Sequence, residues 1–419
     1  MLAACTGGEP PGGPARDQPG SAPEHPGSAP EQPGGPAGDP SRDPPAGLDG
    51  ARAPRTPPSR CQGPRRGSVA EGGVGCFRLS TAPAEPSCAD LPPLATQLAQ
   101  LLLVGFPGTT AGPVSRGLVD RGVGGLLLFR PNVVSAAQVR ALVADLKGRA
   151  GIPLEVAVDQ EPGTRVARLR GIVRAAPPAR ELGGMPAARV ERYGLATGRD
   201  LAALGITADL APVLDVTGAR WDGVIGDRSF GADPATAGRA AVAWMRGLAA
   251  GGVAPVGKHF PGHGATTVDS HRLLPVVGAS MARLRERDLV PFRAAIRAGL
   301  DAVMVGHLLV KAVDPEAPAT LSPAVVGGLL RETMGFDGLV VSDALEMGAL
   351  ASTMSLPAAA ERALAAGIDQ LVLSGHTQVP AVLDHLGRAV AAGRLPRARV
   401  REAFLRVQRF KQVERWSGC

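Results

Sequence analysis

The sequence is poor in aromatic residues and in lysine. Among its 419 residues there are nine phenylalanines, three tryptophans and one tyrosine. Four residues are lysine, so arginine supplies most of the positive charge behind a net charge of +7. A surface that binds nucleic acid needs lysine or arginine clustered on one face, with aromatic residues between them. The sequence has no such cluster, and we therefore expect no nucleic-acid partner.

Cysteine is also scarce, and its positions avoid the apolar part of the chain. No Cys-x-x-Cys pair occurs, which argues against a structural zinc site. No run of 18 apolar residues predicts a membrane-spanning helix. The five cysteines are Cys5, Cys61, Cys76, Cys88 and Cys419.

Residues 1–89 are predicted to form a disordered tail rich in proline and glycine. The first 70 residues hold 16 of the 40 prolines and almost no large apolar side chains. Such a segment cannot bury enough apolar surface to offset the entropy lost on ordering it. Residues 19–39 contain an imperfect seven-residue repeat that is typical of a spacer. We place the domain boundary near Asp90 and expect one catalytic domain over residues 90–415.

The first five residues, Met-Leu-Ala-Ala-Cys, resemble the end of a bacterial lipoprotein signal. A working signal also needs a basic region and an apolar stretch before the cleavage site, and the sequence has neither before Cys5. Two interpretations stay open. In one, the start lies further upstream and a lipidated Cys5 tethers the protein to a membrane, in the cell envelope or outside the cell. In the other, the match is chance and the protein is cytoplasmic.

Beyond Asp90, short apolar segments alternate with helical segments rich in alanine, leucine and arginine. This alternation predicts a parallel sheet with helical crossovers. Seven or eight such units in roughly 325 residues favour an α/β fold with a closed (β/α)8 barrel of the TIM type. An open doubly wound sheet is the alternative, but no Gly-x-Gly-x-x-Gly follows the first strand.

The first helix of the barrel is expected near Gln97–Gly105. The expected strands are Gly125–Phe129, Leu154–Asp159, Ile206–Val213, Val253–Phe260, Asp301–His307, Gly338–Asp343 and Gln370–Ser374. Expected helices include Ala136–Gly148, Ala235–Gly251, Met281–Ala298 and Pro357–Ala366.

Ionisable side chains stand at or just beyond the C-terminal ends of five expected strands. In parallel barrels the active site lies at that end, so we expect these side chains to meet in one cleft. They are Asp159, Asp215, Lys258 with His259, His307, and Asp343.

The densest group of ionisable residues lies in Gly257–His271, which reads Gly-Lys-His-Phe-Pro-Gly-His-Gly-Ala-Thr-Thr-Val-Asp-Ser-His. Its glycines and proline predict a loop after a strand. The segment resembles the hallmark of the β-N-acetylglucosaminidases of glycoside hydrolase family 3. Further segments resemble that family in order and spacing, so that the resemblance covers roughly residues 95–410. They are Val158–Glu161, Ala211–Val216, Ile225–Gly231 and Val341–Met347.

The resemblance implies a retaining exo-β-N-acetylglucosaminidase. Asp343 matches the nucleophile, which forms a glycosyl-enzyme. His271 matches the general acid/base, and Asp269 matches the carboxylate that fixes the tautomer of that histidine. The positions that match sugar-binding residues are Asp159, Arg168, Arg228, Lys258 and His259.

The same resemblance implies a small carbohydrate substrate with a terminal β-linked N-acetylglucosamine, of the cell-wall muropeptide or chitin type. It implies no cofactor and no metal, and we expect a monomer. His263 is expected to hold the shape of the loop, and His307 to support the site from beneath.

The segment after Asp159 departs from the family pattern Asp-Gln-Glu-Gly-Gly-Arg-Val. It is one residue longer, and Pro162 replaces the first glycine. Proline fixes its own φ and pushes Glu161 towards an extended conformation. The shape of this loop, and with it the placement of Arg165 and Arg168, stays open.

Four other functions are considered. A family 3 β-glucosidase usually takes its acid/base from a second domain, whereas this sequence has the Asp-Ser-His loop. A phosphorylase would use phosphate in place of water, which a histidine acid/base allows because it leaves the site less anionic. An inactive sugar-binding lipoprotein would not need Asp343 and His271. A metal-dependent barrel hydrolase would use as ligands His259, His263, Asp269 and His271.

Overall fold

The computed structural model describes residues 91–218 and 223–416. The predicted tail, with Cys5 in it, lies outside these residues. Among the described residues, no helix combines the length and the apolar character that crossing a membrane requires.

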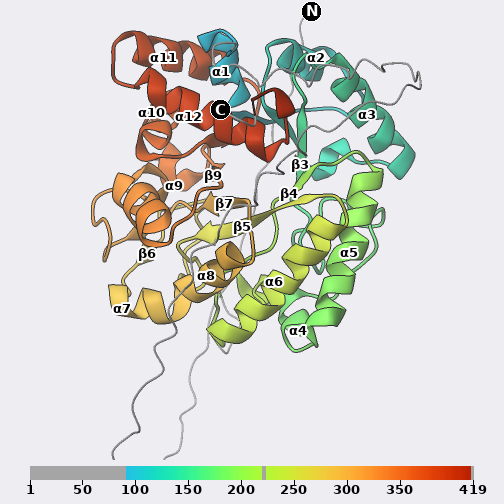
Figure 1. Cartoon of the computed structure of the whole chain (residues 1–419), viewed down its shortest axis with the longest axis vertical. Coiled ribbons are helices and arrows are strands. Elements are labelled where there is room, and N and C mark those ends of the chain that lie inside the picture. The colour runs from blue at the N-terminus through green and yellow to red at the C-terminus, as the bar shows by residue number, and fades with distance from the viewer. Residues whose placement is uncertain (1–90, 219–222, 417–419) are drawn as a thin grey trace, which may run out of the picture. The chain divides into compact units, whose positions relative to one another are not determined.

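Eight parallel strands close into a barrel surrounded by helices (Figure 1), so the prediction of a TIM-type barrel is confirmed. The order of the strands around the barrel is β1-β10-β9-β7-β5-β4-β3-β2. Pairing of Leu103 in β1 with Val372 in β10 closes the ring. The strands are β1 (Leu102–Gly105), β2 (Gly125–Leu128), β3 (Glu155–Val158), β4 (Ala208–Asp209), β5 (Ala254–Phe260), β7 (Ala302–Val305), β9 (Leu339–Ala344) and β10 (Gln370–Leu373). A separate parallel pair consists of β6 (Val276–Val277) and β8 (Leu309–Val310).

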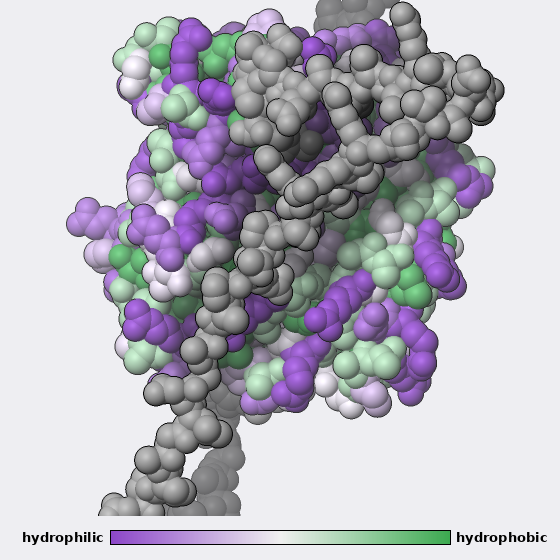
Figure 2. Space-filling model, viewed as in Figure 1, coloured by the Kyte–Doolittle hydropathy of each residue, from purple (hydrophilic) through white to green (hydrophobic). Residues whose placement is uncertain are grey.

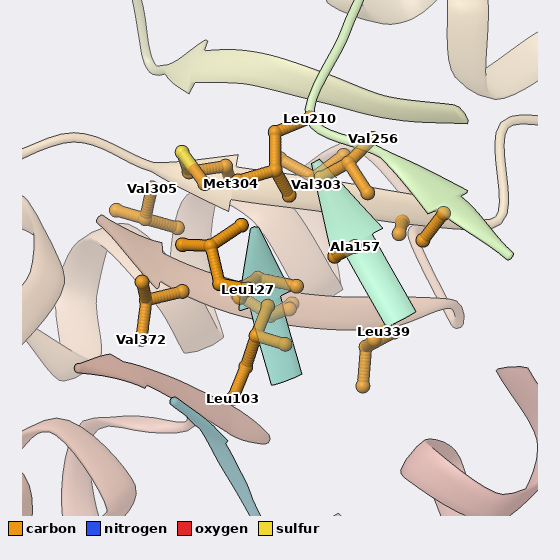
Figure 3. Packing of buried hydrophobic residues seen from close by; sticks show 14 of the residues in the cluster. Leu103, Leu127, Ala157, Leu210, Val256, Val303, Met304, Val305, Leu339 and Val372 are labelled. Carbon is orange, nitrogen blue, oxygen red and sulfur yellow. The ribbon is translucent and has the colours of Figure 1, made fainter. Parts of the chain in front are cut away.

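Apolar side chains from successive strands fill the barrel (Figure 3). Leu103, Leu127 and Val256 are each at most 3% exposed. Because helices cover the outside of the sheet, its strands are buried on both faces and are apolar almost throughout. The barrel is therefore a packed core, and a substrate can bind only at one of its ends.

The helices pack around the strands. They are α1 (Leu94–Gln100), α2 (Pro113–Asp120), α3 (Ala136–Arg149), α4 (Ala179–Gly183), α5 (Ala187–Ala203), α6 (Pro234–Ala250), α7 (Met281–Arg283), α8 (Leu289–Arg297), α9 (Gly348–Ala351), α10 (Leu356–Ala366), α11 (Val379–Ala391) and α12 (Arg397–Phe410). Ser135 caps α3 by accepting a hydrogen bond from the backbone N–H of Gln138. Hydrophilic residues gather at the lower right of Figure 2, where Figure 1 shows α4, α5 and α6.

Helices α5 and α6 lie very close together because glycines face one another. A Cβ atom on Gly194 would lie 2.4 Å from the Trp244 carbonyl oxygen, and one on Gly251 would lie 2.6 Å from the Gly198 Cα. Both positions therefore require glycine, and the close approach fixes the helices that follow β3 and β4.

Three predicted elements differ from the structure. The predicted helix Gln97–Gly105 is wrong in its second half, because Leu102–Gly105 forms β1; a short apolar run does not distinguish a buried strand from a buried helix. The predicted helix Met281–Ala298 is interrupted by a π-helical turn at Leu284–Asp288. The predicted strand Ile206–Val213 is reduced to β4, and Pro212 beyond it has no N–H to donate to a strand ladder.

Candidate active site

A cavity of about 380 Å³ lies at the C-terminal ends of the strands. Apolar residues such as Leu127, Phe129 and Met304 form part of its wall. The wall also includes seven of the eight predicted site residues: Asp159, Arg168, Arg228, Lys258, His259, His271 and Asp343. The eighth, Asp269, contacts His271. Residues spread over most of the barrel sequence therefore meet in one place.

Asp343 lies near the end of β9 and is half-buried. Its Oδ1 accepts a hydrogen bond of 2.8 Å from the backbone N–H of Ala344. Burial tends to raise the pKa of this carboxyl, but the neighbouring imidazoles of His307 and His259 outweigh that effect and hold the pKa below its usual value. Asp343 is thus ionised at neutral pH, as a carboxylate nucleophile must be.

Lys258, at the end of β5, is held between two carboxylates. Its Nζ lies 2.5 Å from Asp159 Oδ1 and 2.7 Å from Glu161 Oε1. Arg228 binds the Glu161 carboxylate through two hydrogen bonds, of 2.7 Å from Nε and 2.6 Å from the terminal nitrogen. The four charges balance, which allows Lys258 to be almost completely buried.

Glu161 is the acidic centre of this network and was missed as a site residue. Burial tends to raise its pKa, but the charges of Arg228 and Lys258 lower it to about 2. Arg228 was expected to contact the sugar, and it does line the cavity, although two of its donors are taken by Glu161. Glu161 could have been found from the sequence, since it belongs to the segment Asp159-Gln160-Glu161 that resembles the family. That segment does not reveal that Glu161 forms ion pairs with Lys258 and Arg228.

Asp215 is a second residue whose role was missed. Its side chain is fully buried, and Oδ2 lies 2.7 Å from His259 Nδ1. Its Oδ1 accepts a 2.7 Å hydrogen bond from the backbone N–H of His263. Burial acts to raise the pKa of Asp215, but His259 outweighs it and the pKa is lowered. Because Nδ1 of His259 is engaged, its Nε2 is the nitrogen left to serve a substrate.

The loop after β5 folds over its own polar side chains. His263 is buried, with Nδ1 lying 2.6 Å from Thr266 Oγ1 and Nε2 lying 3.2 Å from Ser270 Oγ. The end of the loop is tied to α9, since Gly348 N donates to the His271 carbonyl at 3.1 Å. A side chain at Gly348 would collide with that carbonyl, whose oxygen would lie 2.8 Å from the new Cβ. The segment that follows β9 and the loop that carries His271 are thus held together through their backbones.

His271 and Asp269 form a hydrogen-bonded pair in this loop. Asp269 Oδ1 lies 2.8 Å from His271 Nδ1 and also accepts a 3.0 Å bond from the His271 backbone N–H. Burial acts to raise the pKa of Asp269, but these bonds outweigh it and lower the pKa. The His271 side chain is 72% exposed, so solvent reaches an imidazole that also lines the cavity.

The two arginines after Asp159 take different positions. Arg168 lines the cavity, with one terminal nitrogen 3.8 Å from Asp159 Oδ2 and its guanidinium over the ring of Phe129. Arg165 instead pairs with Asp227 at 3.4 Å. Between Asp159 and these arginines, Gly163 adopts a φ of +90°, which suits glycine.

His307 lies beneath the site, completely buried. Its Nε2 lies 2.9 Å from the Ala344 carbonyl and its Nδ1 lies 2.8 Å from Thr320 Oγ1. Burial lowers the pKa of His307. This histidine therefore supports the backbone next to Asp343.

Among residues 91–218 and 223–416, no group of three or more His, Cys, Asp or Glu side chains could hold a metal ion. His259, His263 and His271 each engage Nδ1 with a neighbouring carboxylate or hydroxyl group. The ligand set considered for a metal-dependent hydrolase is thus divided between separate hydrogen-bonded groups.

The chain belongs to glycoside hydrolase family 3, since the model of the glycosyl hydrolase family 3 N terminal domain matches residues 94–410. The resemblance predicted from the motifs is thereby confirmed. A curated relative, β-hexosaminidase LpqI of Mycobacterium tuberculosis, is 40% identical over 343 residues, which are 78% of this chain and 87% of LpqI. A β-hexosaminidase of Alkalilimnicola ehrlichii is 38% identical over 331 residues, 75% of this chain and 93% of that protein.

Solved structures agree with this placement. The structure of M. tuberculosis LpqI matches with a TM-score of 0.72 and 40% identity over 77% of this chain and 94% of that one. A family 3 β-N-acetylglucosaminidase from Paenibacillus matches with a TM-score of 0.75 and 38% identity over 78% of this chain. The chain spans 64% of the length of the Paenibacillus protein.

Proposed function

We propose that this chain is a retaining exo-β-N-acetylglucosaminidase that removes a terminal β-linked N-acetylglucosamine from an oligosaccharide. The observation that carries the proposal is that Asp343, in β9, and His271, in the loop after β5, line one cavity. Relatives named β-hexosaminidase and β-N-acetylglucosaminidase support the same substrate class.

In the first step, an Asp343 carboxylate oxygen attacks the anomeric carbon of the sugar and the glycosidic C–O bond breaks. The protonated His271 gives its Nε2 proton to the departing oxygen, while its Nδ1–H stays bonded to Asp269. The products are a glycosyl ester on Asp343, a neutral imidazole and a released alcohol.

In the second step, the neutral His271 takes a proton from water at Nε2, and the oxygen of that water attacks the anomeric carbon. The bond to Asp343 breaks, and the carboxylate and the imidazolium are restored. Since the carbon is inverted twice, its β configuration is retained.

The remaining polar wall suits a single sugar ring. Lys258 and Arg228 supply donors, and Asp159 supplies acceptors, for hydroxyl groups of the sugar. The cavity volume of about 380 Å³ lies near the lower limit of ligand sites, about 300–1,000 Å³, which favours recognition of one terminal residue.

Hydrolysis of p-nitrophenyl N-acetyl-β-D-glucosaminide, which releases a single sugar, followed by proton NMR tests the proposal, in the presence and absence of phosphate and of a metal chelator. We expect the β-anomer of N-acetylglucosamine to appear first, with no sugar phosphate and no effect of the chelator. Early α-anomer would contradict retention, sugar phosphate would identify a phosphorylase, and loss of activity with the chelator would support a metal-dependent hydrolase.

The proposal extends to the substrate class, the oligomeric state and the attachment to a membrane. We propose that muropeptide-type or chitin-type oligosaccharides are the substrates, that the protein is a monomer, and that lipidated Cys5 tethers it in the cell envelope. Intact mass measurement of protein purified from its native membrane fraction tests the tether, because diacylglycerol on Cys5 adds a mass that an unmodified chain lacks.

A further inference from the structure

A second cavity lies at the opposite end of the barrel from the sugar pocket. Its volume is about 550 Å³, within the range of small-molecule sites. Leu154 and Glu155, where β3 begins, contribute to its wall, as does Ala254 at the start of β5. The end of α12 adds Phe410 and the residues after it. None of its lining residues belongs to the sugar pocket.

Two lysines line this cavity without a carboxylate partner. Lys147 Nζ donates to the Gly205 carbonyl at 2.6 Å. Lys411 Nζ donates to Gln100 Oε1 at 2.6 Å and to the Gly124 carbonyl at 3.4 Å. Both side chains are half-buried, and within residues 91–218 and 223–416 neither forms an ion pair.

Burial lowers the pKa of both lysines, that of Lys411 to about 8, where the nearby Glu155 carboxylate acts in the opposite direction. A partly desolvated ammonium group that has no carboxylate in direct contact gains from an anionic ligand. The cavity wall therefore carries two ammonium groups that can pair with negative charge on a ligand.

Two carboxylates also face the cavity. Glu155 is buried and accepts a 2.5 Å hydrogen bond from Gln370 Nε2, and burial raises its pKa. Asp301 is exposed, and its side chain has no hydrogen bond or ion pair to any residue that the structure describes. Burial of part of Asp301 raises its pKa. A ligand with negative charge alone would meet these acids, so the wall favours one that also carries a positive group.

The turn after α12 contributes Gln412 to the wall. Its φ is +56°, and it is the only non-glycine residue with a positive φ in the described part of the chain. Such a backbone conformation is unfavourable for a side-chain-bearing residue and is over-represented at ligand sites. Phe410, Leu154 and Val253 add apolar surface beside the charged groups.

We propose that this cavity binds a small zwitterion, an amino acid with an apolar side chain or the end of a short peptide. The carboxylate of the ligand pairs with Lys147 and Lys411, and its ammonium group pairs with Asp301. The apolar side chain rests against Phe410 and Leu154. This site is independent of the proposed glycosidase activity.

Three related compounds test the proposal: L-leucine, 4-methylpentanoate, which lacks the ammonium group, and L-leucinamide, which lacks the carboxylate. At increasing ligand concentrations, the full chain is exposed to a brief pulse of acetic anhydride, far below the ligand concentration so that most of the ligand keeps its free amino group, and mass spectrometry measures the labelling of each lysine relative to that of Lys311. We expect L-leucine to protect Lys147 and Lys411 at a concentration about tenfold lower than either analogue, because each analogue leaves one charge without a partner. The exposed Lys311 serves as the internal reference, because its labelling reports how much reagent is available in each sample.

Asp301→Asn tests binding of the ammonium group separately from binding of the carboxylate. Asp301 is exposed, so its replacement leaves the fold intact. In this variant, L-leucine and 4-methylpentanoate should protect the lysines equally. The matched control, Asp145→Asn, removes an exposed carboxylate that pairs with Arg116 and should leave the preference unchanged. Equal protection by leucine and 4-methylpentanoate in the wild type, or no protection by leucine, would overturn the proposal.

Discussion

Lys258 Nζ lies 2.7 Å from Glu161 Oε1, and a terminal nitrogen of Arg228 donates to the same oxygen at 2.6 Å. Glu161→Gln would leave both cations without this counter-charge in a buried position. We expect the free energy of unfolding to fall by about 3 kcal/mol, the cost typical of breaking a buried ion pair. Urea denaturation at neutral pH measures the loss. Asp120→Asn, which removes an exposed partner of Arg149, is the control and should have no measurable effect; a similar loss in both variants would refute the prediction.

Asp215 is expected to orient His259 for the sugar. Asp215→Asn keeps the size of the side chain but removes the charge that fixes the imidazole tautomer. We expect kcat/KM to fall roughly tenfold or more, since misplacing a substrate-positioning group costs at least that much. Ser229→Ala is the control, because the Ser229 hydroxyl bonds to the backbone of Asp215 and Gly231 and not to the Asp215 carboxylate. If Ser229→Ala and Asp215→Asn reduce kcat/KM equally, the effect belongs to the backbone and not to His259.

The Asp269–His271 pair is expected to matter most for substrates with poor leaving groups. His271→Ala should lower kcat/KM for N,N′-diacetylchitobiose by roughly 10²–10⁴-fold, because the leaving oxygen then receives no proton from the protein. With p-nitrophenyl N-acetyl-β-D-glucosaminide the loss in kcat/KM should be much smaller, since nitrophenolate departs without help. Leu273→Ala, a change at an exposed position in the same loop, is the control. Equal losses with both substrates would contradict an acid role for His271.

Asp288 should make the stability of the protein depend on pH. It is buried beside Gly262, and a Cβ there would lie 2.8 Å from the Asp288 Cβ. Burial raises the pKa of Asp288 to about 6 from a usual 3.8. The folded state thus favours the protonated acid, so its contribution to stability is largest below pH 3.8 and is lost as the pH rises through 6.

Asp288→Asn removes the titrating carboxyl and therefore the loss of stability at high pH. We expect the variant to be more stable than the wild type by roughly 3 kcal/mol at pH 8, at 1.36 kcal/mol for each pKa unit, and nearly equal to it at pH 4. Urea denaturation at the two pH values measures the difference. A difference that does not change with pH would show that Asp288 is already ionised in the folded protein at low pH.

Much of the barrel could be predicted from the sequence because its strands are apolar on both faces and separated by helices of ordinary length. Seven strands were expected within a few residues of their positions. Leu102–Gly105 was assigned to a helix, since a four-residue apolar run next to α1 has no periodicity of its own. Pro212 and the residues around it were assigned to a strand although most of them pair only through isolated bonds.

The site was predictable where ionisable residues are close in sequence, as in the loop that carries Asp269 and His271. It was not predictable where partners are far apart. Glu161 and Arg228 are separated by many residues, and no local pattern indicates that one neutralises the other. Likewise, Asp215 was seen as a polar strand end, but its bond to His259 depends on how β4 and β5 align.

The central claim is that the Asp343 carboxylate attacks the anomeric carbon. Incubation with a fluorinated N-acetylglucosaminide whose glycosyl ester hydrolyses slowly, followed by proteolysis and peptide mass spectrometry, tests it directly. We expect one sugar per chain, attached to Asp343. Asp343→Ala should not be labelled, and a control variant, Asp384→Asn, should be labelled like the wild type. A sugar attached to another residue, or wild-type turnover by Asp343→Ala, would contradict it.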